Sequence, residues 1–315
     1  MQARKVNTLI LSGKHDISSD RICHHLNLRK IPFLRINRDD MQNTFLTIDP
    51  VSSSMICKYG NDIWHVDESL KSIWWRNPTF LRNTPGRSLD LQEQLQQSQW
   101  AAALRGLMLF DNALWMNSPD ATYKAESKPY QLRIAKKLGF HVPNTLITND
   151  PSANIIEELG EHIALKSVDT VLLQDEENQY FGFTSLIDWN HCINSDFYLA
   201  PATCQKIITP KLDLRVTVVY DQVWCDAITH DKKGIEGDWR VLPKQQLTYS
   251  SYNLPNDIKN LCVSLVQKLG LRYGAIDLAL SEEIYWFIEI NPTGEWGWLD
   301  RPKRGIAESI VDNLM

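Results

Sequence analysis

Short apolar runs separated by polar turns dominate the first part of the chain. Residues 5–12 predict a buried strand, residues 18–28 a helix and residues 32–37 a second strand. A strand, a helix and a strand in this order indicate a parallel sheet. Helical periodicity returns over residues 89–114. We therefore expect an α/β unit with a parallel sheet at residues 1–117.

We expect a second unit at residues 118–190, in which a helix ends at a glycine. Helical periodicity over residues 127–138 stops at Gly139, and glycine commonly ends helices in the left-handed conformation. Strands are predicted at residues 144–148 and 163–168. The second unit should therefore combine helices and strands as an α+β domain.

The third unit, expected at residues 191–315, contains the clearest helix of the chain. Two paired strands are predicted first, at residues 214–219 and 223–229. The helix is predicted at residues 255–269, where apolar residues recur at three- and four-residue spacing and a glycine follows. This spacing indicates packing against a core, so we assign the helix no chemistry.

Composition narrows the class of protein without identifying it. The chain has 315 residues, of which 43% are hydrophobic and 23% are charged, as in a globular protein with more than one unit. A formal net charge of −5 argues against nucleic acid as a partner. No apolar run approaches the roughly 20 residues of a membrane span. None of the six cysteines lies in a C-x-x-C pair, so we expect reduced thiols and a cytoplasmic protein.

The most informative stretch is residues 274–292, which predicts two antiparallel strands joined by a turn near residues 281–284. This pairing places Asp277 opposite Glu289, and Asn291 shares their face because side chains alternate along a strand. The other face is expected to be the core, formed by Ile276, Leu278, Leu280, Trp286, Ile288 and Ile290. Opposed carboxylates repel unless a positive group lies between them. Two carboxylates and an amide suit a hard cation, Mg²⁺ or Mn²⁺.

Two other interpretations of these carboxylates stay open at this point. One is a solvent-facing sheet surface with scattered charge. The other is a general acid/base pair of the kind that glycosidases use. The alternation of the strands predicts the shared face in every case, whereas the metal is a further inference.

A metal that binds phosphate needs cationic side chains nearby, and several stand at suggestive positions. Lys166 lies inside an apolar strand, where an ammonium group requires a partner. Lys128 opens the predicted helix, and Arg240 follows Asp-Trp in a D-W-R segment. Asp213 and Arg215 share one face of a strand, so an ion pair between them is the simpler alternative to a catalytic role.

Four segments spread along the chain form a recognisable series. They are IWWRNP at 73–78, NSPDATYKAESKPYQLRIAKKLGFHVPNTLITNDP at 117–151, LDLRVTVV at 212–219 with DWR at 238–240, and GAIDLALSEEIYWFIEINPTGEWGWLD at 274–300. In this order they resemble motifs of the ATP-grasp superfamily. More narrowly, they resemble the microviridin-type or graspetide ligases, which macrocyclise ribosomal peptides.

The resemblance implies an α/β (α+β) architecture with the ATP-grasp fold. An N-terminal parallel-sheet domain would be followed by central and C-terminal α+β domains that clasp ATP. The implied cofactors are ATP and Mg²⁺ or Mn²⁺. The implied partners are a precursor peptide, with a leader and a core rich in Thr, Ser, Asp, Glu and Lys, and a second copy of the chain in a homodimer.

Matched position by position, the resemblance also implies roles for individual residues. Nucleotide contacts would come from Lys128, Lys166, Gln205, Lys206, Ile207 and Ile208, the last four as a hinge over adenine. Catalytic contacts would come from Arg215, Asp213 and Arg240, with Arg215 steadying the γ-phosphate or the acyl-phosphate. The metal would be held by Asp277, Glu289 and Asn291.

The chain departs from the family pattern at two places. The residue after the hinge glutamine is often a carboxylate in the family, and here it is Lys206, which puts the adenine contacts in question. The polar residues 169–182 predict a mobile loop or hairpin that would cover the phosphates or touch the peptide. They include the acidic run Asp175, Glu176 and Glu177 and lack the glycines of many phosphate-covering loops.

The activity implied by the resemblance is the joining of a carboxylate to a hydroxyl or amine through an acyl-phosphate. Two alternatives remain. The ligase would instead join free amino acids or small metabolites, or the chain would be a nucleotide-binding module without turnover. A complete set of metal ligands argues against the last, because an inactive relative would be free to lose them.

Overall fold

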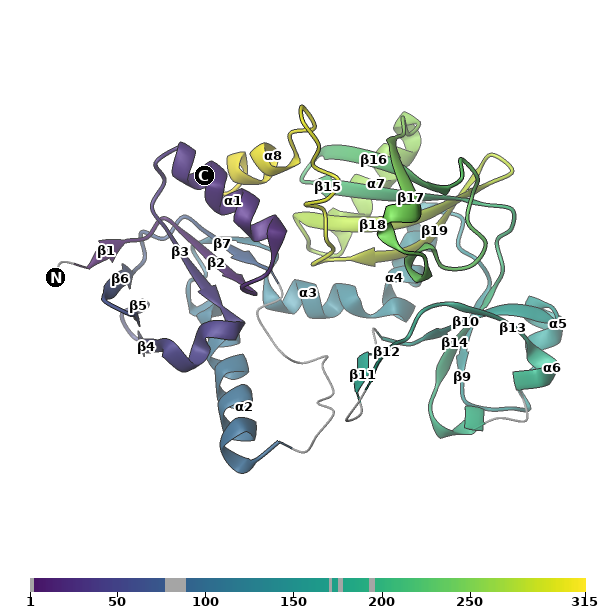
Figure 1. The fold of residues 1–315 in the computed structure, drawn as a ribbon, viewed down its shortest axis with the longest axis horizontal. Coiled ribbons are helices and arrows are strands. Elements are labelled where there is room, and N and C mark those ends of the chain that lie inside the picture. The colour runs from purple at the N-terminus through teal and green to yellow at the C-terminus, as the bar shows by residue number, and fades with distance from the viewer. Residues whose placement is uncertain (1–2, 77–88, 170–171, 175–177, 193–195) are drawn as a thin grey trace.

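The computed structural model describes residues 3–76, 89–169, 172–174, 178–192 and 196–315. The Asn77-Pro78 pair of the first motif and the acidic run at 175–177 lie outside these residues. Figure 1 shows an N-terminal unit on one side, a large C-terminal sheet on the other and a smaller central sheet beneath the latter. Among the described residues, no helix has both the length and the apolar character that a membrane crossing needs.

The N-terminal unit is built on a parallel sheet, as its strand–helix–strand pattern predicted. Four strands lie in the order β3-β2-β7-β8, and every neighbouring pair is parallel. Its elements are β2 (Thr8–Ser12), α1 (Ile17–Leu28), β3 (Phe33–Asn37), β7 (Ser72–Trp75), α2 (Leu91–Gly106) and β8 (Leu114–Met116). All five residues of β2 are buried, because both faces of this central strand are covered.

Two features of the N-terminal unit differ from the prediction or were absent from it. A second sheet, in the order β1-β6-β5-β4, was not predicted. It consists of β1 (Arg4–Lys5), β4 (Thr44–Asp49), β5 (Ser54–Tyr59) and β6 (Asp62–Val66), with the short 3₁₀ helix η1 (Arg38–Asn43) before it. The helix expected to reach residue 114 ends at Gly106, and the 3₁₀ helix η2 (Leu107–Leu109) follows. The prediction was wrong at this end because residues 114–116 pair with β7 instead.

The central sheet is antiparallel and carries a small core on one face. Its strand order is β13-β10-β14-β9. The elements are β9 (Thr145–Thr148), α5 (Ile155–Leu159), β10 (His162–Ser167), β13 (Ser185–Asp188), α6 (Trp189–Cys192), the 3₁₀ helix η3 (Asp196–Leu199) and β14 (Ala202–Lys206). The expected division at residue 190 stays a prediction, but β14 lies after it and pairs with β10 and β9. Within residues 169–182, β11 (Leu172–Gln174) and β12 (Gln179–Phe181) form an antiparallel hairpin.

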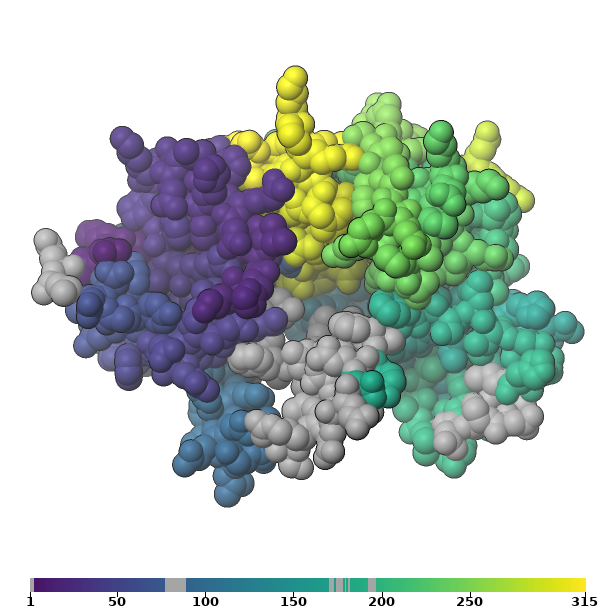
Figure 2. All heavy atoms as spheres, in the orientation of Figure 1, coloured from purple at the N-terminus to yellow at the C-terminus, as the bar shows by residue number. Residues whose placement is uncertain are grey.

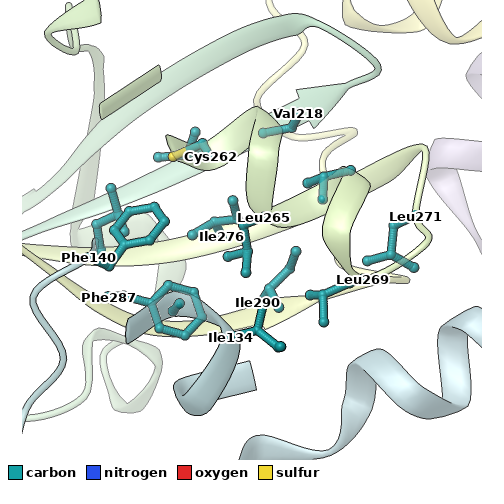
Figure 3. Close-up of a cluster of buried hydrophobic side chains, with 14 of the residues drawn as sticks. Ile134, Phe140, Val218, Cys262, Leu265, Leu269, Leu271, Ile276, Phe287 and Ile290 are labelled. Carbon is teal, nitrogen blue, oxygen red and sulfur yellow. The ribbon is translucent and has the colours of Figure 1, made fainter. Parts of the chain in front are cut away.

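The C-terminal sheet has five antiparallel strands in the order β17-β16-β15-β18-β19. They are β15 (Leu212–Val219), β16 (Gln222–His230), β17 (Leu247–Ser251), β18 (Tyr273–Ser281) and β19 (Ile284–Asn291). The helices α3 (Pro119–Glu126), α4 (Lys128–Leu138) and α7 (Asn256–Lys268) cover its apolar face. Figure 3 shows side chains of α4 and α7 meeting those of the strands, with Phe140 and Phe287 packed 5.6 Å apart between ring centroids. The helix at 255–269 is thus a core helix, as its spacing predicted.

The hairpin of β18 and β19 confirms the predicted carboxylate pair and corrects the predicted core face. Glu282 and Glu283, both with positive φ, form the turn, and Asp277 pairs with Glu289. A bulge between the Asp277 and Leu278 pairs leaves Ile288 without a partner across the hairpin. Because one extra residue reverses the alternation, Phe287 occupies the core, and Ile288 lines the opposite face. Trp286 lies beside the His141 ring, outside the core in which it was expected.

The C-terminal end of the chain returns to the N-terminal unit. Helix α8 (Ile306–Asp312) packs against α1 in one apolar cluster. Figure 2 shows these last residues, in yellow, lying between the purple N-terminal unit and the green C-terminal sheet. Asn117 joins the units as well, because its buried amide donates to the carbonyl oxygens of Tyr273 and Pro292 at 2.9 Å each.

Candidate active site

A cleft of about 750 Å³ lies between the central and C-terminal sheets, at the faces that point away from their apolar cores. Its lining contains nine of the residues that the sequence singled out: Lys166, Gln205, Lys206, Ile207, Ile208, Asp213, Arg240, Asp277 and Glu289. The other three contact this lining, since Lys128 and Asn291 bond to Glu289 and Arg215 bonds to Asp277. The structure therefore brings together side chains that are up to 163 positions apart in the chain, from Lys128 to Asn291.

Lys128 reaches the cleft because the next turn of α4 is fixed to β19. Gln131 lies one turn after Lys128, so both side chains are on one face of the helix. The Gln131 amide donates to the Ile290 carbonyl at 2.8 Å and accepts from the Ile290 N–H at 3.0 Å. This pair of hydrogen bonds to the strand holds the Lys128 ammonium 2.6 Å from Oε2 of Glu289. The K-x-x-Q spacing of Lys128 and Gln131 thus has a structural cause.

Glu289 is the electrostatic centre of the cleft. Its Oε2 atom accepts from Lys128, and its Oε1 atom accepts from Nη1 of Arg240 and Nδ2 of Asn291 at 3.3 Å each. Burial alone would raise the pKa of Glu289, but the Lys128 ammonium and the Arg240 guanidinium hold that pKa well below its usual range. Glu289 is therefore an anion throughout the physiological pH range.

Arg215 pairs across the sheet with Asp277, not along its own strand with Asp213. The two residues are directly opposed on β15 and β18, and Nη1 of Arg215 lies 2.9 and 3.0 Å from the two carboxylate oxygens. Burial raises the pKa of Asp277, against the opposing effect of Arg215. Asp213 instead accepts from Lys211, two residues earlier. The simpler ion pair suggested by the sequence is therefore wrong.

Arg240 is oriented by Asp238, a residue that the sequence analysis missed as a site residue. Asp238 accepts from Nε and Nη2 of Arg240 at 2.9 Å each, in a two-pronged arrangement, and it also accepts from the Thr184 N–H. Asp238 is the N-cap of the short 3₁₀ helix η4 (Trp239–Val241), which contains Arg240. The signal was present in the D-W-R segment, in which Asp and Arg are two residues apart.

Lys166 extends from the central sheet and its ammonium donates to Oε1 of Gln205 at 2.7 Å. Burial lowers the pKa of Lys166 to about 8; the Glu289 carboxylate opposes this shift, and the neighbouring Lys128 and Arg240 add to it. Gln205 is the first of the hinge residues, which line the same wall. The predicted partner of an ammonium inside an apolar strand is therefore a neutral amide, which leaves the positive charge available to an anion.

The donor set fits a divalent cation with a phosphate ligand. Asp277 and Glu289 are opposed, and the Asn291 amide lies against Glu289 through its nitrogen. A metal would be held by the two carboxylates together with the amide oxygen, once that amide turns. Within the described residues, no group of three or more His, Cys, Asp or Glu side chains is arranged for a metal, so the fit depends on this mixed set. The buried Nε of Arg215 has no hydrogen-bond partner in the structure. Because this atom is enclosed by protein, a phosphate would meet the other N–H groups of the Arg215 guanidinium.

The first and last sequence motifs meet beside this site. Trp74 stacks on Trp296 with ring centroids 6.2 Å apart and planes 19° apart. The Glu295 carboxylate accepts from Nη2 of Arg76 at 2.7 Å and from the Ser18 hydroxyl. Nη2 of Arg215 lies 3.4 Å from the Glu295 carbonyl, so this junction adjoins the Asp277 pair. The N-terminal unit is therefore attached to the C-terminal sheet next to the cleft.

No protein-family model and no curated protein sequence matches the chain, but solved structures do. The RiPP-associated ATP-grasp ligase of Chryseobacterium gregarium, in complex with ADP and a leader and core peptide, has a TM-score of 0.84 and 25% identity over 99% of this chain and 96% of that one. The macrocyclase MdnC of Microcystis aeruginosa MRC, bound with the precursor peptide MdnA, has a TM-score of 0.80 and 23% identity over 98% and 99%. The ATP-grasp ligase PsnB, complexed with a minimal precursor, Mg and ADP, has a TM-score of 0.71 and 19% identity over 100% and 98%.

These structures and the cleft define the class: the chain is an ATP-grasp ligase with the predicted α/β architecture. The similar structures include RiPP-associated and macrocyclising ATP-grasp ligases, the type that the motif series resembled.

Proposed function

We propose that the protein forms side-chain ester or amide crosslinks in a ribosomally made precursor peptide, with ATP as the energy source. The observation that carries this proposal is the opposed pair Asp277 and Glu289, set among cations in a cleft between two sheets. The neighbours add support. The Chryseobacterium ligase was captured with ADP and a leader and core peptide, MdnC with a precursor peptide, and PsnB with Mg and ADP.

In this proposal the two sheets divide the binding of MgATP between them. Lys166 and the hinge at 205–208 would hold the base and the inner phosphates from the central sheet. Lys128 would contact the outer phosphates, and Asp277, Glu289 and Asn291 would hold Mg²⁺ or Mn²⁺. When bound, the metal neutralises charge on the transferred phosphoryl group.

The arginines would serve the peptide's side of the reaction. A carboxylate oxygen of a peptide Asp or Glu attacks the γ-phosphorus, ADP leaves, and an acyl-phosphate forms. A peptide hydroxyl or amine then attacks the carbonyl carbon, phosphate leaves, and the nucleophile loses its proton. Arg215 and Arg240 are positioned to stabilise the negative charge in both steps, because each has N–H groups beside the carboxylates of the cleft. Over the cycle the peptide loses one water per ring.

Phosphate release from ATP with Mg²⁺ tests the proposal, with and without a candidate precursor peptide whose core is rich in Thr, Ser, Asp, Glu and Lys, followed by peptide mass. Peptide-dependent release with loss of one water per ring is the expected result. Release without a mass change, or release stimulated only by free amino acids, would move the activity to small-molecule ligation. Nucleotide binding without turnover would make the chain a non-catalytic module.

Two further parts of the proposal concern assembly and location. We expect a homodimer, which sedimentation velocity at micromolar concentration would measure directly. We also place the protein in the cytoplasm, where ATP is available. Five cysteines of the described residues are free thiols, as expected of a reducing compartment: Cys23, Cys57, Cys204, Cys225 and Cys262.

A further inference from the structure

A directed row of hydrogen bonds crosses three adjacent strands of the central sheet and ends at Lys166. The Lys166 ammonium donates to Oε1 of Gln205 at 2.7 Å. The other end of that amide, Nε2, donates to Oγ1 of Thr145 at 2.9 Å. The Thr145 hydroxyl in turn donates to the Pro143 carbonyl at 2.7 Å. Thr145 and Gln205 are directly opposed on β9 and β14, so the row follows from the register of the sheet.

The direction of every bond in this row is determined by its two ends. An ammonium group can only donate, and a carbonyl oxygen can only accept. The Thr145 hydroxyl has one hydrogen, which goes to Pro143, so its oxygen is left to accept from Gln205. The Gln205 amide therefore has one orientation, with its oxygen toward Lys166. Rotation of the amide by 180° would place an NH₂ group against the ammonium and lose both bonds.

The row lies on the cleft side of the sheet, away from its core. The small core occupies the other face, where Ile163 and Cys204 are fully buried. Gln205 and Lys166 line the cleft, and Gln205 is only 3% exposed. Nothing in the packing of the core requires a hydroxyl at position 145. A hydroxyl that accepts a hydrogen bond from one end of a buried amide fixes the orientation of that amide. It therefore also affects the group that is bound at the other end of the amide.

We propose that Thr145 is a positioning residue, which orients the Gln205 amide and through it holds the Lys166 ammonium in the cleft for the nucleotide phosphates. This inference rests on the proposed nucleotide site. It assigns no contact with ATP to Thr145 itself. A merely structural Thr145 would affect folding stability alone, whereas a positioning Thr145 affects the protonation and the ligand affinity of Lys166.

Thr145→Val tests the proposal, because it keeps the shape of the side chain and removes the hydroxyl. Affinity for MgADP, measured by calorimetry on the full chain, should fall about tenfold, the scale of one hydrogen bond to a charged group. Thr145→Ser should keep affinity within about twofold, because serine restores both bonds of the hydroxyl. Thr145→Ala is the second variant if the valine protein fails to fold, and the melting temperature of each variant reports folding separately.

The second measurement uses no nucleotide. Acylation of Lys166 by an amine-selective reagent, followed by peptide mass spectrometry, reports its neutral fraction at each pH. The charged groups that influence Lys166 are Glu289, Lys128, Arg240 and Asp238, and none of them is changed. Loss of an acceptor from the ammonium favours the neutral amine, so Thr145→Val should increase labelling at pH 7 by about threefold.

A double-mutant cycle with Gln205→Met separates orientation from packing. Methionine has no amide to orient and offers no donor to Thr145, so the affinity no longer depends on the Thr145 hydroxyl. In this background the affinity cost of Thr145→Val should shrink from about tenfold to less than about twofold. An unchanged cost would overturn the proposal, and so would a Thr145→Val protein with wild-type affinity and labelling. Failure of the wild-type protein to bind MgADP at all would instead overturn the proposed function.

Discussion

The two sheets that face the cleft have the same plan but differ in the size of their cores. Each turns one face to the cleft and packs the other on apolar side chains. Among the described residues, the C-terminal sheet shares a cluster of twenty buried hydrophobic residues with three helices, and the central sheet shares a cluster of six. The larger sheet carries the carboxylates Asp277 and Glu289, whereas the smaller one carries Lys166 and Gln205.

We relate this difference in core size to two tasks, holding the metal site and closing on the nucleotide. A metal site needs ligands held in one geometry, and a sheet with a large core resists local opening. A nucleotide must also enter and leave, which favours a lighter element on the other side of the cleft. We infer that the C-terminal sheet is the fixed platform and that the central sheet, which we call the clamp, is the part that moves when a nucleotide enters or leaves. This division can be tested at several residues, from the largest expected effect to the smallest.

Glu289→Gln should abolish ligation while leaving the platform folded. The amide keeps the size of the side chain but removes the charge that the proposed metal, Lys128 and Arg240 all use. Loss of several kcal/mol of transition-state stabilisation corresponds to about a 10³-fold lower kcat. Asp277→Asn should behave in the same way. Steady-state phosphate release and the melting temperature measure the two parts separately, and full activity in either variant would remove the metal site.

Phe287→Ala should lower the free energy of unfolding of the whole protein by about 3–5 kcal/mol, because it empties a fully buried aromatic site in the large core. Trp189→Ala is the matched change in the small core, where Trp189 packs edge-on against Phe197. Its effect should stay within the central sheet, so amide hydrogen exchange should speed up in β10 and β14 and remain slow in β15 and β18. Equal loss of protection in both sheets would contradict the division.

Much of the platform was predictable because its signals are local. A turn assumed to be centred on Glu283 placed Asp277 opposite Glu289, and the bulge at Ile288 produces that pairing in the structure. The periodic helix at 255–269 took its expected place in the core. The K-x-x-Q spacing similarly places Lys128 and Gln131 on one helical face. Motif order added the ATP-grasp fold, which periodicity alone does not identify.

The remaining features depend on geometry that the local pattern of residues does not show. The composition of the strand gives no signal for the bulge at Ile288. The bulge nevertheless puts Phe287 in the core in place of the expected Trp286 and Ile288. Asp213 and Arg215 share a face of one strand, but the neighbouring strand and a preceding lysine provided better partners. Asp238 was missed because an aspartate in a turn is usually a cap, although the D-W-R segment places it only two residues from Arg240.

Lys166 makes the clamp sensitive to pH. Its pKa is lowered from 10.5 to about 8, so the folded protein loses this positive charge as the pH rises through about 8. The value of kcat/KM for ATP reports the free enzyme, so it should fall above that pH and be level below it. Lys166→Arg should remove the alkaline fall, since arginine stays protonated. An alkaline fall that persists in Lys166→Arg would assign the titration to another group.

Lys206 should matter least, although it is where the chain departs from its family. Its backbone N–H donates to the Asn144 carbonyl at 2.9 Å, and its side chain is exposed, next to the buried Gln205 in an alternating strand. The proposed hinge would bind adenine through backbone groups, which a side-chain change leaves in place. Lys206→Glu should therefore change KM for ATP by less than about threefold, the scale of an exposed charge. A larger change, measured by initial rates at varied ATP, would mean that the lysine contacts the nucleotide and that the clamp binds through side chains as well as backbone.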